Sequence, residues 1–128
     1  MASECPFLTA EYATRLIGAT QHNADEPRYL QAAATAKHFS MYDLEGYIPR
    51  TDPQPTPASG RCVTPDAGCE RWNFDMRPPP ADFHDYYLPP FKAAVERAEV
   101  ASIMCSYNLA YGIPTCANDE INNGMVRL

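Results

Sequence analysis

The sequence lacks the features that mark several common functional classes. It has no Lys/Arg cluster and a net charge of −6, which argues against a nucleic-acid partner because phosphate binding needs a basic surface. It has no run of 18 apolar residues, so no membrane-spanning segment and no membrane partner are predicted. Internal repeats, a glycine-rich phosphate loop, the Gly-x-Ser-x-Gly elbow and the His-Glu-x-x-His zinc motif are also missing.

The N-terminal residues and the cysteines bear on targeting, disulfides and metal binding. Residues 1–6 lack a basic region followed by an apolar run, so no signal peptide is predicted and the localisation stays open. The five cysteines are an odd number, so at least one has no partner within the chain. Cys62 and Cys69 lie in one Pro/Gly-rich segment and can form a disulfide in an oxidising compartment. No Cys-x-x-Cys pair occurs, so no metal site and no cofactor are predicted.

Helical patterns occur in three parts of what, at 128 residues, should be one domain. Residues 7–20 are predicted to be a helix that Thr9 caps. Residues 81–98 are predicted to be helical, with Asp82 as the cap and an interruption at Pro89-Pro90. A last helix is predicted after Asn118, with acidic residues in its first turn and Arg127 in its last turn.

Strand and loop patterns occur between these helices. Residues 100–108 are predicted to be a strand, whereas residues 28–39 fit either a helix or a buried strand. Residues 46–80 hold eight of the 13 prolines, which favours a long loop or insertion. Within it, Trp72, Phe74 and Met76 alternate and suggest a short strand or an anchor for the loop.

The order of elements predicts an α/β fold with parallel crossovers. Both apolar segments end in polar groups, Lys-His-Phe at 37–39 and Cys-Ser-Tyr-Asn at 105–108. Ligands of α/β folds bind at the carboxyl ends of strands, so these groups are candidates for a pocket rim.

Three stretches, taken in order, resemble the N-terminal barrel domain of glycoside hydrolase family 3. They are AKHFSMYDLE, RWNFDMRPPPADFHDYYLPPFKAAVE and VASIMCSYNLAYGIPTCAN, and SECPFLTAEYA near the start is similar to GEDPFLTGEYA in that family. The YDLE after KHF resembles the β-xylosidase and α-arabinofuranosidase branch more than the β-glucosidases. The resemblance covers residues 1–128 apart from the insertion. It implies an incomplete (β/α)8 TIM barrel, about half of one, with residues 46–80 as the Pro-rich loop.

The same resemblance implies a retaining glycosidase whose partner is a carbohydrate, either a xylo-oligosaccharide or another β-glycoside. By residue-to-residue match, Lys37 and His38 bind sugar hydroxyls, while Met104 and Tyr107 line the same subsite. Retaining hydrolysis needs two carboxyl groups about 5 Å apart, one as nucleophile and one as acid/base. The resemblance implies an Asp and a Glu in these two roles. The resemblance puts the nucleophile on a strand after the stretch matching INNGMVRL and the acid/base in a second domain. The expectation is therefore a fragment that does not hydrolyse by itself.

Five carboxylates near these stretches are expected to be structural, and three positions depart from the family pattern. Solvated loop positions are expected for Asp43 and Glu45, while helix caps or solvent-facing positions are expected for Asp75, Asp82 and Asp85. The departures are Cys5 in place of Asp, Tyr111 in place of Asn, and Glu99 in place of a Gly. The Gly position ends the helix before a strand and favours a residue with backbone freedom.

Other interpretations stay open on the residues alone. The Lys37-His38 pair could end a helix, where cations interact favourably with the helix dipole, and Tyr107 could be a half-buried core residue. Three other functions also fit. They are a non-catalytic sugar-binding remnant, a β-glucosidase-like member of the same family, and a small interaction domain stapled by a disulfide. The sequence predicts no oligomeric state.

Overall fold

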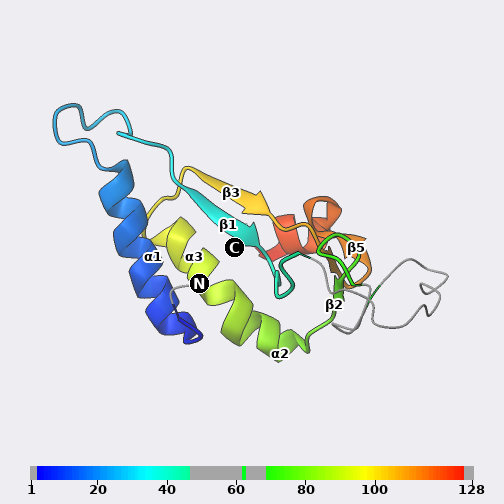
Figure 1. The fold of residues 1–128 in the computed structure, drawn as a ribbon. Coiled ribbons are helices and arrows are strands. Elements are labelled where there is room, and N and C mark those ends of the chain that lie inside the picture. The colour runs from blue at the N-terminus through cyan, green and yellow to red at the C-terminus, as the bar shows by residue number, and fades with distance from the viewer. Residues whose placement is uncertain (1–2, 47–61, 63–68, 126–128) are drawn as a thin grey trace. The chain divides into compact units, whose positions relative to one another are not determined.

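The computed structural model describes residues 3–46, 62 and 69–125 of the 128-residue chain (Figure 1). These residues form two compact units. The first unit draws on Met1–Phe39 and Pro79–Met104, and the second on Ser40–Pro78 and Cys105–Leu128. Helices and strands occur together, so the predicted α/β class is confirmed. No helix in the described residues is long and apolar enough to cross a membrane.

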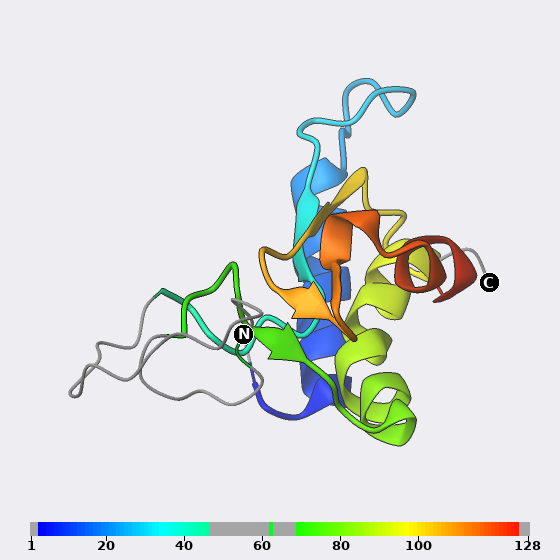
Figure 2. The ribbon, with the colours of Figure 1, turned by 90° about the vertical axis from the view of Figure 1, so that its right-hand side faces the viewer.

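Helix α1, Pro6–Gln21, packs against α3, Leu88–Glu96, in the first unit (Figures 1 and 2). It begins at Pro6 because proline's missing N–H needs no partner in a first turn. Thr9 therefore lies inside the helix, where its hydroxyl donates to the Ser3 carbonyl at 2.8 Å. The prediction that Thr9 caps the helix was wrong.

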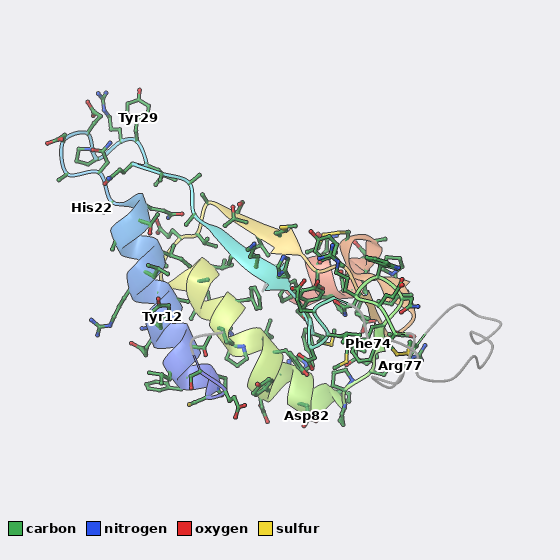
Figure 3. All side chains as sticks on the ribbon, viewed as in Figure 1. Tyr12, His22, Tyr29, Phe74, Arg77 and Asp82 are labelled. Atoms are coloured by element: carbon green, nitrogen blue, oxygen red, sulfur yellow. A yellow bond between two sulfur atoms is a disulfide. The ribbon has the colours of Figure 1, made fainter. Side chains whose placement is uncertain are left out.

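Residues 80–96 form one continuous helical run rather than two helices. It consists of α2 (Pro80–Asp82), the π-helix η1 (Phe83–Tyr87) and α3. Within η1 the Leu88 N–H donates to the Phe83 carbonyl, five residues earlier. This shift in hydrogen-bond register precedes Pro89-Pro90 and places them in the first turn of α3. The predicted interruption is therefore wrong. Asp82 makes no capping bond, and its side chain is exposed (Figure 3).

Strands β1, Thr35–Phe39, and β3, Ser102–Cys105, pair with each other, and their arrows point the same way in Figure 1. The ambiguous segment 28–39 is thus a strand only over its last five residues. The predicted strand at 100–108 is real but shorter. Phe39 is buried and lies edge-on against Phe91 of α3, with ring centroids 4.9 Å apart.

The second unit is built on a small three-stranded sheet. Strand β2 (Asp75–Met76) pairs in parallel with β4 (Leu109–Ala110), which pairs in antiparallel fashion with β5 (Ile113–Pro114). The two-residue turn between β4 and β5 has φ 52° at Tyr111 and 87° at Gly112, as tight hairpin turns require. The alternating segment Trp72–Met76 of the predicted loop therefore contains one short strand, β2. Residues 47–61 and 63–68 of that loop lie outside the described residues.

Short helical turns close the second unit. The 3-10 helix η2 (Thr115–Ala117) is followed by the π-helix η3 (Glu120–Met125). The Asn118 side-chain oxygen accepts from the Ile121 N–H at 3.2 Å, which confirms the predicted cap. Arg127 lies outside the described residues.

Candidate functional site

Three of the four predicted site residues lie on the paired strands of the first unit. Lys37 and His38 are in β1, and Met104 is in β3. Lys37 is exposed, His38 is half-buried and Met104 is 36 % exposed. Hydroxyls of Thr35 and Ser102, 2.5 Å apart, join the two strands near their starts. Lys37, His38 and Met104 therefore lie closer to the carboxyl ends of these two neighbouring strands than the linked hydroxyls do.

Tyr107, the fourth predicted residue, belongs to the second unit and lies two residues after the end of β3. It is 45 % exposed, and the ring of Tyr42 packs against it with centroids 5.7 Å apart. The guanidinium of Arg71 lies 4.8 Å from the Tyr107 ring centroid. Tyr107 is thus held by ring and cation contacts and is not a core residue.

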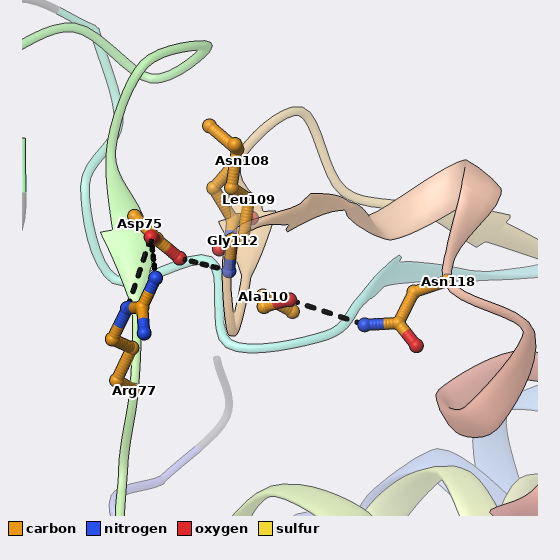
Figure 4. A network of polar contacts seen from close by, with 7 residues as sticks. All are labelled: Asp75, Arg77, Asn108, Leu109, Ala110, Gly112 and Asn118. Carbon is orange, nitrogen blue, oxygen red and sulfur yellow. Dashed lines mark hydrogen bonds and ion pairs between the residues drawn. The ribbon is translucent and has the colours of Figure 1, made fainter. Parts of the chain in front are cut away.

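The carboxylate expected on the surface at Asp75 is instead the centre of a buried network, shown in Figure 4. Asp75 is 1 % exposed and accepts from the Gly112 N–H at 2.7 Å. Arg77 donates to it twice, through Nε at 3.0 Å and a terminal nitrogen at 2.8 Å. The prediction failed because β2 turns this side chain toward the β4–β5 hairpin. The chain itself therefore supplies hydrogen-bond partners to both oxygens of this buried carboxylate.

Two disulfides occur in the described residues. One joins Cys62 to Cys69, the pair considered from the sequence, and the other joins Cys105 to Cys116. Cys5 is exposed and is not in a disulfide. The spacing of Cys105 and Cys116 gave no signal of pairing, because the β4–β5 hairpin between them is what brings them together.

A surface groove of about 240 Å³ lies in the first unit at the end of α1. Its lining includes His22 and Tyr29, labelled in Figure 3, together with Gln21 and Glu99. None of the four predicted site residues lines it. Across the described part of the chain, no three His, Cys, Asp or Glu side chains gather closely enough to hold a metal ion.

Sequence reasoning missed the side chains that surround Tyr107. Arg71 donates to Glu45 at 3.2 Å, and the Tyr42 hydroxyl donates to the same carboxylate oxygen at 3.3 Å. Burial raises the pKa of the Tyr42 phenol above its usual value, so the hydroxyl stays a neutral donor. Glu45 was expected to be a solvated carboxylate, and it is exposed but ion-paired. The sequence signals for this region were the YDLE stretch at 42–45 and the RW dipeptide at 71–72, but neither indicates that the two segments meet.

Comparison with known proteins gives these residues a context. No protein-family model matches the chain. The chain is 32 % identical over 97 % of its length to β-xylosidase/α-L-arabinofuranosidase 1 of Medicago sativa subsp. varia. It is 36 % identical over the same share to a probable exo-1,4-β-xylosidase of Aspergillus terreus. It spans only 14 % of the length of either relative.

A solved structure agrees with the sequence relatives. It is a family 3 exo-β-xylosidase in complex with a xylobiose aziridine activity-based probe. The match has a TM-score of 0.71 and 34 % identity, and it covers 94 % of this chain and 13 % of that one. Over nearly their whole length, the 128 residues are therefore homologous to a segment of the β-xylosidases of glycoside hydrolase family 3.

Proposed function

We propose that this chain supplies part of the sugar-binding side of a retaining, β-xylosidase-like glycoside hydrolase. The observation that carries the proposal is identity of 32 to 36 % to named β-xylosidases over 97 % of the chain. Its substrate would be the terminal xylose of a xylo-oligosaccharide. None of its carboxylates is assigned as nucleophile or acid/base, so the 128-residue chain is proposed to bind sugar without hydrolysing it.

The proposed architecture is an incomplete (β/α)8 barrel, with residues 1–128 as part of the N-terminal domain and 46–80 as its Pro-rich loop. Two features of the first unit support it. Strands β1 and β3 run the same way with α3 between them in the sequence, as in a βαβ unit. In addition, Leu8, Tyr12 and Leu16 on α1 are each more than half exposed at four-residue spacing. Such an apolar stripe is typical of a helix that packs against a neighbour in a complete barrel.

The proposed sugar contacts are Lys37, His38, Met104 and Tyr107. Lysine offers only donors, while a neutral histidine can donate and accept, so together they suit the mixed needs of sugar hydroxyls. The Met104 thioether and the Tyr107 ring supply apolar area for the carbon face of a sugar. Three of these four residues lie on two adjacent strands, in accord with binding at strand ends.

The test combines a hydrolysis assay with a binding assay on the 128-residue chain. We expect no release of nitrophenol from 4-nitrophenyl β-xyloside, because no catalytic pair is assigned. We expect xylose to raise the melting temperature, since a ligand that binds only the folded state stabilises it. Lys37→Ala should abolish this shift, while Lys92→Ala, at an exposed lysine of α3, should leave it unchanged.

Each part of the proposal can fail separately. Hydrolysis by the wild-type chain would show that one of its own carboxylates is catalytic. Absence of any xylose effect would remove the sugar-binding role. A larger shift with glucose than with xylose would favour the β-glucosidase-like alternative, because only glucose carries the extra hydroxymethyl group.

A further inference from the structure

The groove of about 240 Å³ in the first unit lies where helices α1 and α3 both end. Gly18 and Gln21 of α1 line it, together with Ala98 and Glu99, which follow α3. Glu99 lies three residues before β3 begins, so the groove is near the start of that strand. The proposed sugar contacts do not line it, and the groove is free to serve a different ligand.

The two walls of the groove are joined through Gln21, which is buried. Its side-chain nitrogen donates to the Glu99 carbonyl at 3.1 Å, and its side-chain oxygen accepts from the Ala101 N–H at 2.8 Å. Its backbone carbonyl accepts from the Gln31 N–H at 3.0 Å, which holds the loop that follows α1. The walls are therefore in place before a ligand arrives, which reduces the entropy cost of binding.

The charges around the groove favour a cation. The C-terminal end of a helix carries a partial negative charge, and neither α1 nor α3 has a basic residue in its last turn. Glu99 adds a full negative charge, since its carboxylate forms no ion pair within the described residues. Two arginines next to lining residues are already paired, Arg28 with Glu26 at 2.9 Å and Arg97 with Glu11 at 2.6 Å.

The backbone conformation of Glu99 supports a role in binding. Its φ of 48° lies in the left-handed region, which costs free energy in a residue with a Cβ atom. Residues held in such conformations are found preferentially at ligand-binding sites. In this chain the strained residue is also the one whose unpaired carboxylate lines the groove. Both features fit a residue that serves a ligand rather than the stability of the fold.

The other lining residues suit the stem and the fork of an arginine. Tyr29 is 65 % exposed even though the Arg28 guanidinium lies 5.8 Å from its ring centroid, and Leu30 is 53 % exposed. Both therefore offer apolar area to an aliphatic stem. His22, at the same end of α1 as Tyr29 in Figure 3, can accept from an N–H when its imidazole is neutral.

The size and the free carboxylate narrow the choice of cation. Drug-sized ligands fill pockets of about 300–1,000 Å³, so a groove of about 240 Å³ suits one long side chain. A carboxylate and a guanidinium can form two parallel hydrogen bonds, whereas a lysine ammonium is a point charge. Arginine therefore matches Glu99 better than lysine does.

We propose that this groove binds an arginine side chain presented by a partner protein. Glu99 accepts hydrogen bonds from the guanidinium, the ends of α1 and α3 stabilise its charge, and the stem packs on Tyr29 and Leu30. The net charge of −6 attracts a basic partner over a longer range. The inference goes beyond the proposed function and does not depend on it, because the two use different residues.

The test uses a capped tripeptide, leucine-arginine-leucine, and a version with citrulline, which keeps the shape of arginine but has no charge. Each is titrated into the isotope-labelled 128-residue chain and followed by amide chemical shifts. We expect the arginine peptide to move signals of residues 21–31 and 98–101, and the citrulline peptide to bind about tenfold more weakly. Glu99→Gln keeps the Cβ atom and should weaken the arginine peptide about tenfold. Glu96→Gln, at a carboxylate that Lys92 already pairs, should change little.

Several outcomes would overturn the inference. Equal binding of the two peptides would show that the charge is not recognised, and unchanged binding to Glu99→Gln would show that this carboxylate is not the anion. Shifts spread along the whole chain would indicate non-specific attraction to its net charge. Groove signals that move with the concentration of the chain alone would assign the groove to a second copy.

Two controls keep a loss of binding interpretable. Circular dichroism establishes that Glu99→Gln is folded, and the citrulline peptide tests the same charge on the unaltered chain. The xylose effect on the melting temperature of Glu99→Gln should equal that of the wild-type chain. Failure of the peptide to bind therefore leaves the proposed sugar-binding function intact, and failure of xylose to bind leaves this inference intact.

Discussion

Glu99 is predicted to lower the stability of the chain, so Glu99→Gly should raise it. Glu99 has φ 48°, a left-handed conformation that costs a residue with a Cβ atom about 1–2 kcal/mol. Glycine avoids that cost but loses about 0.5–1 kcal/mol more conformational entropy on folding. The net gain is therefore about 0.5–1 kcal/mol, or roughly 2–5 °C in melting temperature for a chain of this size. Thermal unfolding followed by circular dichroism measures it.

Three further variants separate the backbone from the side chain. Glu99→Ala keeps the Cβ atom and should gain nothing, while Glu99→Asn should fall between alanine and glycine because Asn tolerates this conformation. Glu96→Gly, at the last residue of α3, should lose up to about 1 kcal/mol, because glycine disfavours helical conformation and the ion pair with Lys92 is lost. If Glu99→Ala stabilises as much as Glu99→Gly, the carboxylate is responsible and the backbone argument is refuted.

Three other predictions follow from polar contacts. Gln21→Ala should lower the free energy of unfolding by about 2–3 kcal/mol, as measured by urea titration. The buried Gln21 amide hydrogen-bonds three backbone groups, at residues 98, 99 and 101. Arg77→Ala should cost more than Asp75→Asn, since it leaves a buried carboxylate without its cation, and the same urea titrations compare them. The Arg97 hydrogen bond lowers the pKa of Glu11, so its stabilisation is present above the ordinary carboxyl pKa and is lost as the pH falls through the lowered value. Glu11→Gln should remove that acid-dependent part of the melting temperature, most clearly at low salt.

Sequence reasoning succeeded where local physics decides the structure. Helix α1 was predicted from apolar spacing, and the Asn118 cap from the residue type that satisfies free N–H groups. The Gly preference at position 99 was inferred from the resemblance, and the left-handed φ there gives its physical reason. Each of these features depends on residues that are neighbours in the sequence, so the sequence alone is sufficient to predict it.

The failures occurred where residues distant in sequence meet. Asp75 is buried because it bonds Gly112, 37 residues away, and no local pattern signals such a partner. Arg71 lies over Tyr107 for the same kind of reason, since 36 positions separate them along the chain. The roles of the four predicted site residues stay predictions, because they depend on a sugar that only a binding experiment supplies.

Tyr111 shows why a departure from a family pattern does not by itself mean a loss of stability. Its φ of 52° favours Asn or Gly, as at position 99. Unlike Glu99, however, the Tyr111 hydroxyl donates to the Pro78 carbonyl at 2.8 Å, and its ring is only 39 % exposed. Tyr111→Asn should therefore gain less than Glu99→Gly, because relief of about 1 kcal/mol of backbone cost is offset by a lost hydrogen bond of similar size. Tyr111→Phe removes only the hydroxyl and should be destabilising. A melting temperature for Tyr111→Asn that rises as far as that of Glu99→Gly would show that the hydroxyl contributes nothing.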